Sequence, residues 1–350
     1  MQYIVLYFFE FIFLVTTKSR FLSQSTINCI FASMLRIFLG NQLFALLLLP
    51  FILVGYVVLN SYMHNFEVLP SIELGLWGKH SFYNINALYY LTGGIVLMNA
   101  ILANYLFNSN DFYDRNSYVI SLFYIVFTSY FQSFYHLDGI LLSHTFILFA
   151  IFQLFHLENN ADGRKWSFNA GIFFGIAATL NPPLFILLPV IWLMITRIRP
   201  FVFREILLST LGFAVPIVYL IFYLFLNEDI ILKNVFEINK LAIQNNWVIV
   251  ISIVLFAFSS FLSLIAISYK TSKSSLRFKK LTAILKLLMS VSILLGLVEY
   301  LSLGHYELLS ISMIALAFFL PFAFFTKSSS LVGKLLFYGT FVFSILRFFI

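Results

Sequence analysis

Apolar runs long enough to cross a lipid bilayer recur along the chain, separated by short polar segments. A spanning helix needs about 20 predominantly apolar residues, and about nine runs of that length can be marked. They are residues 41–60, 84–107, 117–135, 139–157, 206–226, 248–268, 281–300, 308–325 and 335–349. The pattern predicts an all-α polytopic transmembrane bundle of about nine spans.

A further apolar region, residues 167–196, is interrupted at its centre by Asn181, Pro182 and Pro183. Consecutive prolines remove two backbone donors, and Pro182 disfavours the helical conformation at Asn181. Basic residues flank both ends of the region, which indicates that both ends lie on the same side of the membrane. Each arm has about 14 residues, or about 20 Å of helix. We therefore expect a broken, re-entrant hairpin.

The expected hairpin has two interpretations. Lipid cannot satisfy backbone groups freed at such depth, so the break must be buried in protein or line a wet cavity. The candidate cavity residues are Asn181, Pro182, Pro183, Gly171 and Gly175. The alternative is close helix packing, because Gly171, Gly175 and Ala178 have the spacing of small-residue helix interfaces. Close packing is the preferred interpretation.

Three other segments complete the expected topology. Residues 227–247 carry polar and apolar side chains on separate helical stripes, as an interfacial helix does. Residues 61–82 fit a short segment at the level of the lipid headgroups. In residues 1–33 the bases follow the apolar core, the reverse of a signal peptide. We expect 1–33 to be an N-terminal extension and 34–350 to form a single transmembrane domain.

Composition agrees with this topology. Hydrophobic residues make up 61% of the chain and charged residues 10%, against roughly 45 to 50% and about 25% in soluble domains. A water-soluble fold is therefore excluded. Cys29 is the only cysteine, so neither a disulfide framework nor a cysteine-based metal site is available.

The 21 Lys and Arg residues are scattered between apolar runs instead of lining one helix face, so nucleic acid is not an expected partner. With Arg36 in the cytoplasm, most of the bases fall on the cytoplasmic side. The exceptions are Lys79, Lys233, Lys240 and Arg347. Cytoplasmic loops carry the excess of Lys and Arg, so we expect a cell inner-membrane protein with the residue 34 end cytoplasmic.

Partners and cofactors follow from the same charges. Membrane lipids are expected, together with other membrane proteins if the chain works as a subunit. The candidates for contacting phosphate or lipid headgroups are Arg197, Arg199 and Arg204, although topology alone also places bases there. No cofactor is expected.

Few side chains are placed for catalysis. His136, His144 and His156 spread over about 30 Å of one helical stretch, so they cannot bind one metal, and no metal is expected. The acids outside the spans are Glu67, Glu73, Asp138, Glu228, Asp229, Glu299 and Glu307. Of these, Glu67, Glu73 and Asp138 are the candidates for general-base or metal chemistry at the outer face, with ordinary solvated loop acids as the preferred alternative.

Two stretches and a hairpin resemble a known family. They are "NDFYDRNSYVISLFY" at 110–124, the Gly-rich hairpin from Phe168, and "RPFVFREILLSTLGFAVP" at 199–216. Together they resemble an uncharacterised family of Bacteroidota inner-membrane proteins, classed among the domains of unknown function as number 6427. The resemblance covers residues 34–226 and implies a bacterial inner-membrane location without an activity.

A second resemblance lies in the hairpin, "GIFFGIAATLNPPLFILLP". It is similar to a stretch in the membrane cores of polytopic glycosyltransferases that use polyprenyl-phosphate sugars. Those enzymes place a catalytic Asp or Glu in a sizeable outer loop after the first span, whereas the corresponding loop here is short and holds Glu67 and Glu73. The leading expectation is therefore a non-catalytic subunit or scaffold of an envelope assembly. The alternatives are such a glycosyltransferase or an uncoupled lipid or small-molecule transporter.

Overall fold

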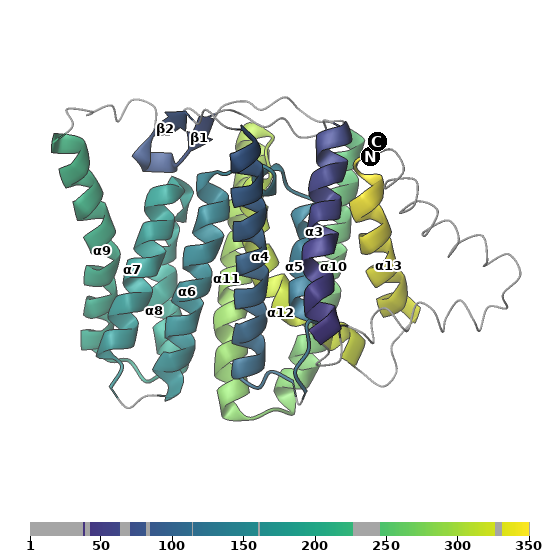
Figure 1. The fold of residues 1–350 in the computed structure, drawn as a ribbon. Coiled ribbons are helices and arrows are strands. Elements are labelled where there is room, and N and C mark those ends of the chain that lie inside the picture. The colour runs from purple at the N-terminus through teal and green to yellow at the C-terminus, as the bar shows by residue number, and fades with distance from the viewer. Residues whose placement is uncertain are drawn as a thin grey trace, which may run out of the picture.

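A computed structural model describes residues 38, 43–63, 71–81, 85–113, 115–159, 162–226, 246–325 and 331–349. The expected extension 1–33, residues 227–245 of the expected interfacial helix 227–247, and Glu67 lie outside these ranges. Nearly all described residues are helical. The helices stand side by side, with α9, α7 and α8 at one side of the molecule and α3, α10 and α13 at the other (Figure 1).

The described elements are named in chain order. The α-helices are α3 (Leu43–Met63), α4 (Ile85–Ser109), α5 (Val119–Thr128), α6 (Gly139–Asn159), α7 (Arg164–Leu180), α8 (Leu187–Ile198), α9 (Phe203–Leu226), α10 (Asn246–Ser272), α11 (Leu276–Leu303), α12 (Ser312–Phe325) and α13 (Leu331–Leu346). The 3₁₀-helices are η2 (Gly75–Trp77), η3 (Gln132–Phe134), η4 (Pro182–Ile186) and η6 (Glu307–Ile311). Two short strands are β1 (Ser71–Glu73) and β2 (Lys79–Ser81).

Six of the described helices are long and apolar enough to cross a membrane. The spanning segments are Phe44–Tyr62, Leu88–Ser109, Gly139–Glu158, Phe203–Leu226, Trp247–Ser272 and Leu276–Ser302. Each coincides with a run marked in the sequence. Shorter apolar helices cover Val119–Thr128, Pro182–Ile198, Glu307–Ala323 and Leu336–Leu346. The bundle is thus a multi-pass membrane architecture with six helices of spanning length.

Helix α5 is shorter than the run 117–135 that predicted it. It ends at Thr128, where the Thr128 and Ser129 hydroxyls donate to the carbonyls of Ile125 and Val126. Such side chains compete with the backbone pattern of a helix. All ten residues of α5 are buried, so this helix is enclosed by its neighbours and does not face lipid.

The proline break ends α7 as expected. Asn181 is extended, with φ −142° and ψ 97°, because a following proline disfavours the helical region. Both ends of the hairpin meet at one residue: a side chain at Gly163 would overlap the Glu205 carboxylate, and Arg199 pairs with that carboxylate. The hairpin therefore returns to its starting side.

The tip of the helical hairpin formed by α7, η4 and α8 reaches further across the bundle than the sequence predicted. The carbonyl of Leu180 lies where a side chain on Gly139 would be, and Gly139 is the first residue of α6, a helix of spanning length. The arms are α7, with 17 residues, and the stretch from η4 to the end of α8. The hairpin thus extends along the whole of α6 instead of stopping near its middle.

Glycines bring α7 against α9. A Cβ at Gly175 would lie 2.5 Å from the Phe213 carbonyl oxygen, and one at Gly171 would overlap the carbonyl of Ser209. Both partners lie on α9 and advance in the same direction, so the two helices run parallel. Gly171 and Gly175 therefore serve in close packing, the preferred of the two interpretations, and not as the cavity-lining residues of the other one.

The segment 71–81 is a small β-hairpin, a local structure that its interpretation as a headgroup-level segment did not include. Ile72 pairs with His80 in the antiparallel register, and Gly75 has φ +58°. The indole N–H of Trp77 donates to Thr179 Oγ1 over 3.3 Å. The β-hairpin 71–81 therefore sits on the tip of α7. We call this end of the bundle the sheet end (Figure 1).

Candidate functional site

Ionisable side chains from separate segments gather at the sheet end. They are Glu73 of β1, His136 and Asp138 between η3 and α6, Glu299 near the end of α11, and Glu307 at the start of η6. This set is called the acid cluster. Asp138 Oδ2 lies 3.6 Å from His136 Nε2, and both residues interact electrostatically with Glu73 and Glu307. Two of the three outer acids singled out in the sequence, Glu73 and Asp138, therefore lie at the same end of the bundle.

Three acids of the cluster also fix the backbone around them. Asp138 Oδ1 accepts the N–H of Leu141 at 2.8 Å, in the arrangement of a helix N-cap on α6. Glu307 Oε1 accepts the N–H of Gln132 at 3.1 Å, and Glu299 Oε2 accepts that of Leu308 at 2.7 Å. Each carboxylate thus satisfies a donor that would otherwise lack a partner at the start of a helical turn.

Beside the cluster, in the part of the chain that the structure describes, two buried side chains each hold a polar atom without a hydrogen-bond partner. The atoms are Asn181 Nδ2 and His136 Nδ1, on residues that are 8% and 9% exposed. Asn181 follows Leu180, whose carbonyl lies against Gly139 next to Asp138. An unpaired buried polar group costs roughly 1 to 3 kcal/mol, so these atoms mark places where a water or a polar ligand group would be stabilised.

Burial sets the protonation of the Asp138–His136 pair. It raises the pKa of Asp138 well above the usual value, because the charged carboxylate loses its hydration. Burial also lowers the pKa of His136, and the nearby Glu307 opposes that effect. Both shifts favour the uncharged pair, in which a protonated carboxyl lies beside a neutral imidazole.

This raised pKa predicts a pH-dependent stability. Folded Asp138 keeps a proton that the unfolded chain releases near pH 4, so its contribution to the free energy of unfolding falls as pH rises above that value. Asp138→Asn keeps an N-capping oxygen and removes this titration. The stability difference between the two proteins should therefore change by up to about 1.4 kcal/mol for each pH unit, in favour of the variant as pH rises.

Thermal unfolding in detergent at pH 5, 6, 7 and 8 measures this difference. The matched control is Asp162→Asn, because the Asp162 side chain is 73% exposed. Parallel curves for wild type and Asp138→Asn would contradict the raised pKa.

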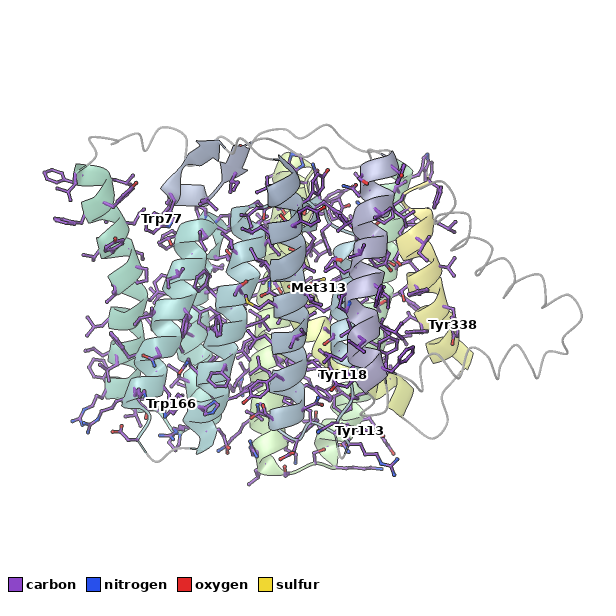
Figure 2. All side chains as sticks on the ribbon, in the orientation of Figure 1. Trp77, Tyr113, Tyr118, Trp166, Met313 and Tyr338 are labelled. Atoms are coloured by element: carbon purple, nitrogen blue, oxygen red, sulfur yellow. The ribbon has the colours of Figure 1, made fainter. Side chains whose placement is uncertain are left out.

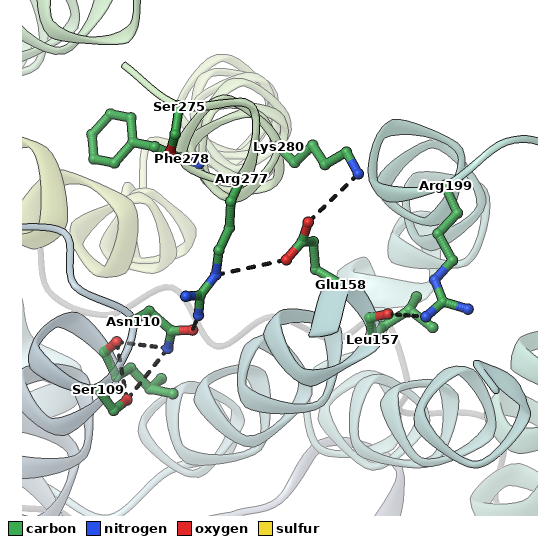
Figure 3. Close-up of polar contacts among 10 residues, drawn as sticks. Ser109, Asn110, Leu157, Glu158, Arg199, Ser275, Arg277, Phe278 and Lys280 are labelled. Carbon is green, nitrogen blue, oxygen red and sulfur yellow. Dashed lines mark hydrogen bonds and ion pairs between the residues drawn. The ribbon is translucent and has the colours of Figure 1, made fainter. Parts of the chain in front are cut away.

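The opposite end of the bundle is held by ion pairs (Figure 3). Glu158, at the end of α6, lies 3.6 Å from Arg277 Nε and 3.5 Å from Lys280 Nζ, both on α11. Arg199 Nη1 lies 3.3 Å from Glu205 Oε1, and Nη2 donates to the carbonyl of Leu157. These contacts fasten the end of α6 to α11 on one side and to the hairpin on the other.

The ion pair with Glu205 corrects one expected lipid contact. The Arg199 side chain is only 16% exposed and Glu205 only 7%, so Arg199 is occupied inside the protein. Arg197 and Arg204, the other two candidates, are exposed. Of the expected cavity residues, Asn181 is buried, Pro182 is half-buried and Pro183 is exposed.

A histidine network lies inside the bundle, between the two ends. His144 is fully buried, with Nδ1 at 3.1 Å from the Tyr124 hydroxyl and Nε2 at 3.2 Å from the Ser310 hydroxyl. His144 is therefore a hydrogen-bonded core residue, as the preferred interpretation of the histidines held. In the part of the chain that the structure describes, no group of three His, Cys, Asp or Glu residues could hold a metal ion.

A buried arginine joins α13 to the sheet end. Arg347 is 4% exposed, and its guanidinium donates to the Ser129 carbonyl at 2.6 Å and the Tyr306 hydroxyl at 3.1 Å. The charge pattern of the sequence places Arg347 among the bases of the outer side. Its side chain is instead buried and makes contacts inside the protein. Beside it lies a shallow crevice too narrow to hold a water molecule, lined by Tyr130, Phe131, Ser252, Ile253, Phe256, Tyr306 and Leu309.

Sequence reasoning missed His136 as a member of the acid cluster. The sequence does contain a signal for it, the local pattern His136-Leu137-Asp138 just before an apolar run. This pattern places an imidazole next to an N-capping carboxylate. Comparison of the chain with protein-family models, curated proteins and solved structures found no significant match.

Proposed function

We propose that this protein binds a lipid-linked sugar at the acid cluster, in the manner of polyprenyl-phosphate-sugar glycosyltransferases. One observation carries the proposal: Glu73, Asp138 and Glu307, from three separate segments, interact electrostatically with His136 beside the tip of the hairpin. The hairpin is the stretch that resembles these enzymes. Carboxylates and imidazoles are the groups that accept sugar hydroxyls and serve as general acids or bases.

The proposed chemistry uses the pair at Asp138. A carboxyl and an imidazole whose atoms lie 3.6 Å apart can each give a proton to, or take one from, a hydroxyl bound between them. The unpartnered atoms Asn181 Nδ2 and His136 Nδ1 supply further hydrogen bonds to a polar headgroup. Apolar helices around the cluster would accommodate the lipid part of such a substrate.

The proposed topology places the sheet end outside a bacterial inner membrane and the residue 34 end in the cytoplasm. Exposed bases at the opposite end support this orientation: Arg115, Arg164, Lys165, Arg197, Arg204, Lys270, Lys273 and Lys279. The same proposal includes membership of the uncharacterised Bacteroidota family. It also includes about nine spans in addition to the hairpin, and the return of the hairpin to the cytoplasm.

Cysteine labelling tests the orientation. Ser272 and Ser302 are exposed near opposite ends of the bundle, Ser272 at the end of α10 and Ser302 at the end of α11. In a Cys29→Ser background, Ser302→Cys should react with an impermeant maleimide in whole cells, whereas Ser272→Cys should react only after the membrane is opened. Reaction of both in whole cells contradicts the proposed topology.

Lipid retention tests the function. The purified protein in mild detergent, incubated with undecaprenyl-phosphate hexose or with undecaprenyl phosphate alone, should retain the sugar-bearing lipid preferentially in native mass spectrometry. Glu307→Gln and Asp138→Asn should each weaken that preference by about tenfold, the effect of one lost hydrogen bond to a charged or polar group. Asp162→Asn, at the opposite end, is the matched control. Equal retention of both lipids overturns the proposal.

A second function is favoured by a different observation. Because Asp138, Glu299 and Glu307 each accept a backbone N–H, the cluster could be a structural tie in a non-catalytic subunit or scaffold of an envelope assembly. Under this alternative the substitutions lower stability and leave lipid preference unchanged. Co-purification from membranes in mild detergent should then recover a stoichiometric protein partner.

A further inference from the structure

The loop between α8 and α9 exposes aromatic rings to its surroundings between two exposed bases. Phe201 is 69% exposed and Phe203 is 66% exposed. Arg197, in the last turn of α8, and Arg204, in the first turn of α9, are exposed as well. Rings and bases alternating at the end of apolar helices are typical of the boundary between lipid headgroups and acyl chains.

A buried pair holds the shape of this loop. Arg199 lies between the exposed residues in sequence, yet its guanidinium is turned inward to Glu205 and to the Leu157 carbonyl. The loop is therefore anchored by Arg199 and Glu205 from within. The exposed rings and bases of the loop therefore face the surroundings of the bundle at this end.

Helix register places the two exposed arginines at one level. The Trp192 indole N–H on α8 donates to Thr210 Oγ1 on α9 over 3.0 Å. Arg197 is five residues nearer the loop than Trp192, and Arg204 is six residues nearer than Thr210. At 1.5 Å per residue, both lie about 8 to 9 Å below that hydrogen bond.

Helix α7 brings further basic residues to the same level. Its Gly171 is seated on Ser209 of α9, and because the helices run parallel, Lys165 is set beside the first turn of α9. Lys165 Nζ lies 5.4 Å from the centre of the Trp166 ring. Trp166 and Trp77 lie at opposite ends of the bundle (Figure 2), as the aromatic residues of two membrane interfaces do.

We propose that residues 197–204 and Lys165 form a binding site for an anionic phospholipid. Arg197, Arg204 and Lys165 contact the lipid phosphate, and Phe201 and Phe203 enter among the acyl chains. Charge complementarity selects the lipid, because the site holds three bases while the neighbouring acids Glu205 and Asp162 are paired with Arg199 and Arg164. The site lies at the end of the bundle opposite to the acid cluster and does not depend on the function proposed for that cluster.

Native mass spectrometry of the delipidated protein tests the proposal with two probes, phosphatidylglycerol and phosphatidylcholine carrying the same acyl chains. Wild type should retain phosphatidylglycerol preferentially. Arg197→Gln with Arg204→Gln should reduce that preference by about tenfold or more, since each base near an anionic surface contributes appreciably to binding. Inorganic phosphate at millimolar concentration should not compete, because it has no acyl chains for the two phenylalanines.

The matched control is Lys270→Gln with Lys273→Gln, which removes the same net charge from exposed positions outside the loop. Phe201→Ser with Phe203→Ser should reduce retention of both lipids, and unfolding temperatures should stay within a few degrees of wild type because all these side chains are exposed. Equal retention of the two lipids by wild type overturns the proposal. So does an equal loss in the control, or displacement of the lipid by inorganic phosphate.

Discussion

Glu205→Gln should reduce the free energy of unfolding by about 3 to 5 kcal/mol, the cost of leaving a buried charge without its partner. The Glu205 side chain is 7% exposed, and Arg199 Nη1 lies 3.3 Å from its carboxylate. Without that carboxylate, Arg199 keeps its positive charge and its bond to the Leu157 carbonyl. It loses the negative charge that compensates its own inside the protein. Thermal or denaturant unfolding in detergent measures the loss, and membrane abundance should fall with it.

Two further variants separate charge from packing. Arg199→Met with Glu205→Gln should recover much of the lost stability, because no buried charge remains. Glu158→Gln should cost less than about 1 kcal/mol, since its partners Arg277 and Lys280 are 37% and 39% exposed. If Glu205→Gln and Glu158→Gln prove equally mild, the Arg199–Glu205 pair does not fasten the hairpin.

Gly175→Leu should disrupt the contact between α7 and α9. A Cβ alone at this position would lie 2.5 Å from the Phe213 carbonyl oxygen and 3.1 Å from its Cα. Backbone atoms cannot move aside as a side chain can, so the helices must separate. Overpacking of this kind costs roughly 1 to 3 kcal/mol, a large part of the marginal stability of a protein. Unfolding temperature and membrane abundance are the readouts.

The matched control is Gly94→Leu on α4, because Gly94 is exposed and a Cβ there would meet nothing within 4 Å. It removes a helical glycine of the same kind, adds the same side chain and should leave stability near wild type or slightly above it. Gly175→Ala should be intermediate. Equal stability of Gly175→Leu and Gly94→Leu would show that α7 and α9 can separate without cost.

The hydrophobic runs predicted the helices well because the length and hydropathy of a run are local properties that can be read from that run alone. The run 206–226 appears as α9, and the proline pair ends α7 as the local conformational rules require. The small-residue spacing of Gly171 and Gly175 indicated close packing, although only the structure identifies α9 as the partner helix. Periodicity has no comparable signal for the 3-residue strands β1 and β2, which depend on their contact with the tip of α7.

The candidate site was harder to predict because its members come from distant segments. Asp138 and Glu307 meet only when α6 and η6 are placed side by side, and nothing in either segment specifies that contact. Arg199 and Glu205 are close in sequence, but a topology rule that counts bases treats every arginine as exposed. The charge pattern therefore predicted a side of the membrane for each loop, which stays a prediction, and missed the internal ion pair.

The seating of the β-hairpin on the tip of α7 has a consequence for the order of assembly. Gly75 lies against the Leu180 carbonyl, and Trp77 bonds to Thr179, so both contacts join segments made at different times. Synthesis proceeds at about 5 to 20 residues per second, which separates Gly75 from Leu180 by roughly 5 to 20 s. During that interval the early loop has no docking surface, and a nascent chain stalled before residue 180 should leave Trp77 open to chemical modification.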